Sequence, residues 1–143
     1  MREILFRGKC VQVGIYHERW IEGFYGEDDG KALIAHNTDF GLVGYVCDPD
    51  TIGQYTGITD KNGKRIFEGD IVRLNEDYDY GSDNRFLRIP LLVEWDMEMA
   101  RFKAYKSVLP KGEVCVDTGL ELYDDEYEVI GNIHDNPELL EGE

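Results

Sequence analysis

Carboxylates are the most numerous side chains in this sequence that could do chemistry, because 30 of its 143 residues are aspartate or glutamate. A tight group of them near the C-terminal end could supply the oxygen ligands that a divalent cation prefers. The spacing matches no specific cation-binding motif, and a run of like charge usually forms a solvated face. We therefore expect an acidic interaction surface without a metal or other cofactor. Its residues are Asp124, Asp125, Glu126 and Glu128.

A second acidic stretch, beginning at Asp77, resembles a calcium-binding loop at first sight. Such a loop has a glycine at its sixth position and a bidentate glutamate at its twelfth. Counted from Asp77, the glycine falls one position early, at Gly81, and the twelfth position is Arg88. The stretch is therefore not a calcium loop, and we interpret residues 75–84 as a long hairpin loop.

Histidine and cysteine, the usual groups of nucleophilic catalysis, show no local motif. His17, His36 and His134 share no metal-ligand spacing, and none stands beside a serine or cysteine in a nucleophile signature. A Cys–His pair built from distant residues stays open, but buried structural roles are favoured. Glycine-rich phosphate loops are also absent from the sequence. We therefore predict a protein without enzymatic activity.

The cysteine pattern indicates a reducing compartment. Cys10, Cys47 and Cys115 are odd in number and far apart in sequence, unlike a disulfide framework or a zinc motif. We expect all three to be reduced and buried. No secretory signal opens the chain, and no apolar run approaches the ~20 residues that span a bilayer. These features predict a cytoplasmic protein that does not contact a membrane.

Charge is distributed unevenly along the chain, whose formal net charge is −15. Residues 113–143 carry eleven acids and no lysine or arginine, whereas residues 61–112 carry ten bases and nine acids. Such a field repels a phosphate backbone, so nucleic acid is disfavoured as a partner but left open. The middle block interleaves bases with aromatic rings, as single-strand binders do. We favour the alternative that the rings fill a core while the bases face water. The bases concerned are Arg85, Arg88, Arg101 and Lys103.

Strand signals dominate the secondary structure. Residues 11–16 place apolar side chains at every second position, which predicts a half-buried strand. One helix start is indicated by Asn136 as N-cap and Pro137 at the first helical position. Further strands are predicted at residues 3–7, 20–25, 42–47, 71–74, 86–95, 101–105 and 128–134.

The strongest local signal lies within residues 54–74. Asn62-Gly63 readily adopts the positive φ that tight hairpin turns need, and Glu68-Gly69-Asp70 forms a second turn that starts a β-branched strand. These residues therefore predict two turns joined by a short, geometrically restricted connection.

This segment resembles the core signature of the YopX-like phage and prophage proteins. The closing segment at residues 128–140 and the opening Arg2–Arg7 stretch are also similar to that family. The resemblance implies an SH3-type β-barrel in the C-terminal two thirds and an origin in a phage or prophage genome. Such an origin places the protein in the cytoplasm of a bacterial host cell. The resemblance implies no activity and no catalytic residues, since the family is functionally uncharacterised. The matching core residues are Gln54-Tyr55-Thr56-Gly57-Ile58, Asp60-Lys61-Asn62-Gly63-Lys64 and Ile66-Phe67-Glu68-Gly69-Asp70-Ile71-Val72.

Taken together, these features predict a mainly β protein. Residues 1–51 would form a β-rich N-terminal arm or subdomain, and residues 52–143 a small SH3-like barrel with a short C-terminal helix. We expect a non-enzymatic phage accessory protein that self-associates and binds a host or phage protein. The alternatives are a nucleic-acid-binding barrel and an acidic DNA mimic that inhibits a host protein. The candidate interaction surface comprises Asp124, Asp125, Glu126, Glu128, Arg85, Arg88, Arg101 and Lys103.

Overall fold

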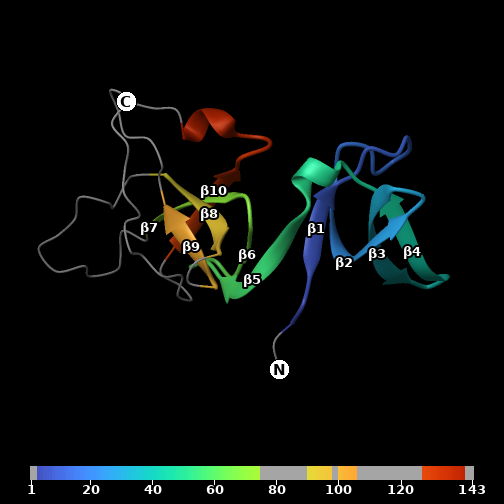
Figure 1. Cartoon of the computed structure of the whole chain (residues 1–143), viewed down its shortest axis with the longest axis horizontal. Helices are drawn as coiled ribbons and strands as arrows, with labels where there is room; N and C mark the ends of the chain where they lie inside the picture. The colour runs from blue at the N-terminus through green and yellow to red at the C-terminus, as the bar shows by residue number, and fades with distance from the viewer. Residues whose placement is uncertain (1–2, 75–89, 98–99, 106–126, 141–143) are drawn as a thin grey trace, which may run out of the picture. The chain divides into compact units, whose positions relative to one another are not determined.

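Two antiparallel sheets make up the computed structural model of the chain, which describes residues 3–74, 90–97, 100–105 and 127–140. The prediction of a mainly β protein is therefore confirmed. The contacts divide the chain into two compact units, Met1–Gly57 and Ile58–Glu143, and each is described separately below. The predicted domain ranges, 1–51 and 52–143, stay a prediction. Figure 1 shows the strands, which are β1 (Phe6–Lys9), β2 (Trp20–Asp28), β3 (Lys31–Thr38), β4 (Gly41–Val46), β5 (Gly53–Thr59), β6 (Arg65–Phe67), β7 (Asp70–Leu74), β8 (Leu91–Asp96), β9 (Arg101–Tyr105) and β10 (Tyr127–Asn132).

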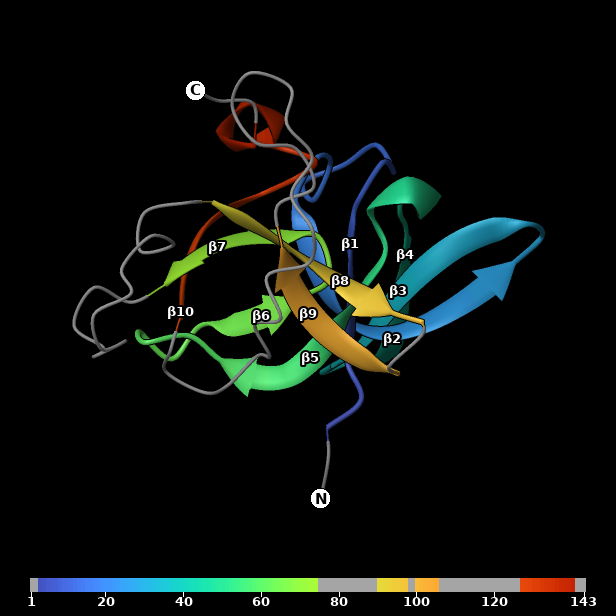
Figure 2. The same ribbon diagram turned by 60° about the vertical axis from the view of Figure 1, so that its left-hand side comes forward.

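The first unit is a meander in which β1, β2, β3 and β4 pair in sequence order, with β5 on the other side of β1. Figure 2 shows β2 and β3 as a long hairpin. Its turn is at Asp29-Gly30, where both residues have positive φ. Alternation along the strands buries Ile21 and Ile34 on one face together with Cys10 and Cys47. These four side chains form the core of the unit.

The predicted strand at residues 11–16 is wrong, because this segment forms a loop between β1 and β2. Gly14 has a φ of 147°, and turn hydrogen bonds join His17 N–H to the Gly14 carbonyl and Arg19 N–H to the Tyr16 carbonyl. The chain therefore folds back on itself instead of continuing beside a neighbouring strand. Strand β3, by contrast, was not predicted from the sequence.

The second unit contains the four-stranded sheet β10-β7-β8-β9 and the hairpin that precedes it. The Asn62-Gly63 turn is confirmed, since Asp60 and Lys64 are joined by a backbone hydrogen bond of 2.8 Å and Gly63 has a φ of 80°. Gly69 also has a positive φ, as the second predicted turn requires. The core residues are Ile66, Val72, Leu74, Leu91, Val93, Ala104 and Tyr127.

The strands described in this unit do not close into a barrel, so the SH3-like assignment stays a prediction. The predicted C-terminal helix is corrected to a short 3₁₀ turn, η3 (Pro137–Leu139). Asn136 precedes it but makes no capping bond, because its Oδ1 accepts the N–H of Asn132 at 3.3 Å instead. Within the described part of the chain, no helix is long and apolar enough to span a bilayer.

Candidate functional site

The loop between β1 and β2 presents apolar side chains to solvent. Val11, Val13 and Ile15 are 47%, 92% and 78% exposed, respectively. The alternation that suggested a half-buried strand thus forms a projecting row of apolar groups. Burying one such side chain fully is worth about 1.5–3 kcal/mol. Contact with an apolar part of another protein would therefore be favourable here.

Hydrogen bonds at both ends hold this loop in place. At its base, Cys10 accepts the N–H of Glu18 at 2.7 Å and donates its own N–H to the Arg19 carbonyl at 2.9 Å. Along its side, Val11 donates its N–H to the Val46 carbonyl at 2.9 Å. The side-chain oxygen of Gln12 accepts the N–H of Val46 at 3.2 Å. The exposed row is therefore part of a fixed loop, which lowers the entropy cost of binding.

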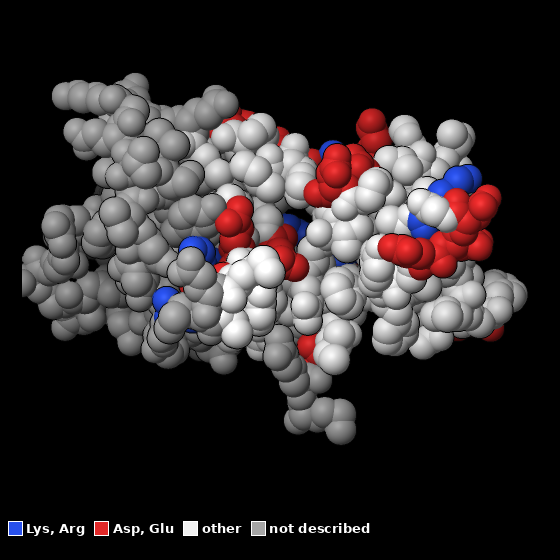
Figure 3. Space-filling model, viewed as in Figure 1, with Lys and Arg blue, Asp and Glu red and all other residues white. Residues whose placement is uncertain are grey.

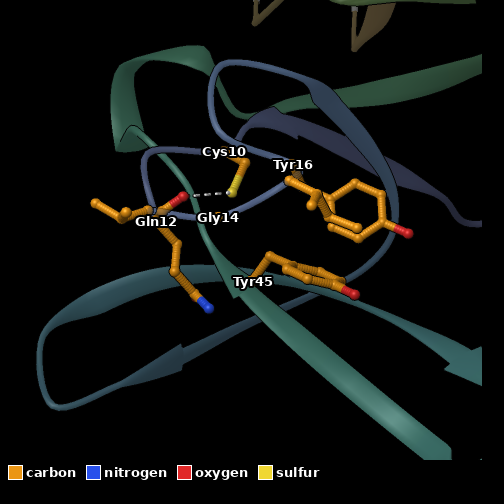
Figure 4. Close-up of a pocket in the computed structure, with 7 residues that line it drawn as sticks. Cys10, Gln12, Gly14, Tyr16 and Tyr45 are labelled. Carbon is orange, nitrogen blue, oxygen red and sulfur yellow. Dashed lines mark hydrogen bonds between the residues drawn. The ribbon is translucent and has the colours of Figure 1, made fainter.

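A pocket of about 230 Å³ lies beneath the loop. Figure 4 shows the rings of Tyr16 and Tyr45 on one side of it, and their centroids are 5.0 Å apart in an edge-to-face arrangement. The Cys10 sulfur points into the same space, where its thiol donates a weak hydrogen bond to the Gln12 carbonyl at 3.8 Å. The lining is mainly apolar, a composition suited to an apolar or aromatic side chain. The lining residues are Cys10, Gln12, Val13, Gly14, Ile15, Tyr16 and Tyr45.

The first unit holds two buried thiols. Cys10 and Cys47 are free and buried, as predicted; Cys115 lies outside the described residues. Burial raises the pKa of the Cys47 thiol to about 11, and the neighbouring Cys10 thiol adds to the effect. Across the described residues, no cluster of three or more histidine, cysteine, aspartate or glutamate side chains is placed to hold a metal ion.

Glu128 is the one member of the predicted acidic cluster that the structure describes. One carboxylate oxygen of Glu128 lies 2.7 and 2.8 Å from two guanidinium nitrogens of Arg73, which belongs to the adjacent strand β7. Lys61 lies 3.8 Å from the other oxygen of this carboxylate. These pairs join β10 to β7 and to the Asn62-Gly63 turn, so Glu128 has a structural role. Asp124, Asp125 and Glu126 lie outside the described residues.

The two described members of the predicted basic group face an acid. Arg101 and Lys103 lie 3.9 and 4.0 Å from one carboxylate oxygen of Asp96. The β8–β9 register places Trp95 opposite Phe102, on the strand face that does not carry these bases. Rings and bases thus lie on opposite faces, which does not match a stacking platform. Arg85 and Arg88 lie outside the described residues.

The buried carboxylates of the 54–74 segment stabilise the fold. Asp60 accepts backbone N–H groups from Asn62 and Lys64 across its own turn, at 2.8 and 2.9 Å. Its second oxygen accepts the N–H of Val129 in β10 at 3.0 Å. Asp70 accepts the N–H of Phe67 at 2.8 Å in the second turn. The segment that carries the family resemblance is therefore a scaffold element.

Among the charged side chains on the described surface that faces the viewer in Figure 3, acidic ones cover more area than basic ones, in keeping with the net charge of −15. Sequence reasoning did not select the 11–16 loop as a site. One signal was available, since Gly14 interrupts the apolar alternation of residues 11–16. The sequence could not show that no strand pairs with this segment.

Comparison with known proteins gives a family and a fold relative. The family model described as "YopX protein" matches residues 6–141. A solved structure, that of protein EF1440 from Enterococcus faecalis, is 27% identical and covers 98% of this chain and 99% of its own, with a TM-score of 0.52. No curated protein matches the chain significantly. Neither the described side chains nor these comparisons assign a reaction to the protein.

Proposed function

The chain belongs to the YopX protein family, and from this premise we propose that it is a non-enzymatic protein-binding module of a phage or prophage. Its binding surface is the 11–16 loop with the pocket beneath it. The observation that carries the proposal is the exposure of Val13 and Ile15, at 92% and 78%, on a loop that hydrogen bonds hold in place. Apolar groups fixed on the surface of an otherwise acidic protein are typical of a docking site.

The preferred ligand is a protein segment with one protruding apolar or aromatic side chain. That side chain would enter the pocket and pack against the rings of Tyr16 and Tyr45, and the flanking residues would cover the exposed row. Buried aromatic contacts of this kind carry much of the binding energy in protein interfaces. The partner is a host protein, a phage protein or a second copy of this chain.

Self-association through this surface has further support in β4, the edge strand of the first unit's sheet. Val46 at the end of β4 bonds to Val11 and Gln12, so the strand edge and the loop form one continuous surface. Its sequence, GLVGYV, contains none of the charged residues or prolines that usually protect an edge strand. Leu42 on this strand is 62% exposed, and Phe40 in the preceding turn is 97% exposed. An edge of this kind favours pairing with a second copy of the same strand. For the second unit, we propose an SH3-like arrangement of the strands.

Nucleic-acid binding is less well supported, because Arg101 and Lys103 face Asp96 and lie away from the Trp95–Phe102 pair. The idea of a DNA mimic rests on Asp124, Asp125, Glu126 and Glu128. The pairing of Glu128 with Arg73 reduces what that residue can offer to a partner.

The test is capture from host lysate with tagged full-length chain. A double variant, Val13→Asp with Ile15→Asp, places charge on the exposed row without touching the buried core. The matched control is Met97→Asp, since Met97 is 86% exposed but belongs to the second unit. We expect wild type and control to recover the same specific protein and the double variant to lose it. Recovery of that protein by the double variant at the wild-type level would rule out the loop as the binding surface.

A further inference from the structure

Cys10 and Cys47 are directly opposite each other on antiparallel chain segments, although 36 residues separate them in sequence. In this bridge, the residue that follows each cysteine donates its N–H to the carbonyl of the residue that precedes the other, at 2.9 Å in both cases. That pattern defines a non-hydrogen-bonded pair, in which the two Cα atoms are about 4.5 Å apart and the side chains project to the same face. This spacing falls within the range that a disulfide requires.

The two thiols differ in their access to a reagent. Both residues belong to the buried core of the first unit, at 1% and 2% exposure. Only Cys10 lines the pocket beneath the 11–16 loop, into which its sulfur points in Figure 4. Cys47 is absent from the pocket lining, and its thiol donates to the Tyr45 carbonyl at 3.5 Å. A small reagent in the pocket would therefore meet Cys10 first.

We propose that Cys10 and Cys47 form a redox-active dithiol that closes to an intrachain disulfide when a low-molecular-weight disulfide enters the pocket. The Cys10 thiolate attacks one sulfur of the reagent, so the reagent's S–S bond breaks and one thiol leaves. The Cys47 thiolate then attacks the Cys10 sulfur of the mixed disulfide and releases the second thiol. Two electrons pass from the protein to the reagent, and the two thiol protons leave with the products.

The order of these steps follows from the environment of each sulfur. The raised pKa of Cys47 leaves it protonated at neutral pH, which suits a second, intramolecular attack more than a first attack on a free reagent. The backbone bridge holds Cys47 beside Cys10, so this attack needs only rotation about side-chain bonds. Closure would tie the end of β1 to the end of β4 and draw the Cys10 sulfur away from Gln12, thereby changing the pocket.

The test uses the full chain with Cys115→Ser, which leaves only the two cysteines of the pair. Reduced protein is incubated with oxidised glutathione, free thiols are then blocked, and peptides are mapped by mass spectrometry. We expect one linked peptide pair that joins Cys10 to Cys47, a protein lighter by two hydrogen atoms, and reversal by dithiothreitol. The oxidised protein should unfold at a temperature higher by about 5–10 °C, because the cross-link restricts the unfolded chain.

A second variant tests the order of attack. With Cys47→Ala added, the reaction should stop at the mixed disulfide, with glutathione attached to Cys10. Full alkylation of both thiols after oxidation of the Cys115→Ser protein, which keeps both cysteines of the pair, would overturn the proposal. Attachment of glutathione to Cys47 in a Cys10→Ala variant, at the rate seen for Cys10, would overturn the assignment of Cys10 as the entry point.

Discussion

Asp60 is fully buried, and its carboxylate serves three backbone N–H groups from two parts of the second unit. Asp60→Ala leaves those three groups without their acceptor. A buried donor without a partner costs about 1–3 kcal/mol. We expect Asp60→Ala to lower the free energy of unfolding by about 2–4 kcal/mol in urea denaturation. Asp39→Ala, at an exposed turn, is the control and should change it by less than about 0.5 kcal/mol. Equal effects of the two substitutions would contradict the structural role of Asp60.

Cys47 makes stability depend on pH in the alkaline range. Because burial raises the pKa of the folded thiol from 9.0 to about 11, the unfolded thiol loses its proton first as the pH rises. The contribution of the protonated Cys47 thiol to the stability of the folded protein is thus fully present below pH 9 and is lost as the pH rises to about 11. At pH 11 the loss amounts to about 2 kcal/mol, because each full pKa unit is worth roughly 1.4 kcal/mol and the folded thiol is itself half ionised there.

Denaturation of the reduced protein across this pH range measures that effect. The stability advantage of wild type over Cys47→Ala should shrink by about 2 kcal/mol as the thiol of the unfolded chain ionises. The comparison cancels the titration of lysine and tyrosine residues, which both proteins share. A difference that stays constant from neutral pH to pH 11 would show that Cys47 does not carry the shift.

For individual residues, the sequence predicts which side chains are buried better than it predicts which side chains lie close together. The free, buried state of Cys10 and Cys47 followed from their number, spacing and residue type. Their pairing did not, because it depends on how the ends of β1 and β4 meet after three hairpin connections have formed. The partners of Glu128 were hidden for the same reason, since Arg73 lies opposite it only in the β10–β7 register.

Glycines in the strands of the first unit show how closely its elements approach. A Cβ at Gly23 in β2 would lie against the Ala35 carbonyl of β3, whereas a Cβ at Gly44 in β4 would make ordinary contacts at 3.8 Å. We expect Gly23→Ala to destabilise the protein by about 2 kcal/mol or more, because the hairpin must shift. Gly44→Ala is the matched control and should be neutral or slightly stabilising. Thermal unfolding measures both, and similar melting temperatures would contradict the close approach.

Elements with local turn chemistry were predicted well. The Asn62-Gly63 turn and the β8–β9 hairpin depend on residues that are adjacent in sequence. The 11–16 segment was mistaken for a strand because alternation describes a side-chain pattern and says nothing about a pairing partner. The helical turn at Pro137 was placed correctly, but as 3₁₀, since Asn136 bonds to Asn132 instead of capping a longer helix.

Over the whole molecule, the strongly acidic composition excludes no fold class but favours solubility. The charge therefore allows exposed apolar groups on the 11–16 loop without general aggregation. Composition and strand patterns predicted a mainly β protein, and the 54–74 motifs indicated the family. The binding surface was sought among the charged residues of the C-terminal third and the middle block. The surface that we propose lies in the N-terminal unit, because exposure of apolar side chains depends on tertiary contacts that a single sequence does not display.

The central claim is that the 11–16 loop binds protein, and self-association measured by light scattering tests it most directly. Wild-type chain at micromolar concentration should give a mass at least twice that of the 16.5 kDa monomer. Val13→Asp with Ile15→Asp should give the monomer mass while Met97→Asp keeps the wild-type mass, and all three should have the same melting temperature within a few degrees. A monomeric wild type would contradict the proposed self-association, and a double variant that assembles like wild type would contradict the loop as the surface that mediates it.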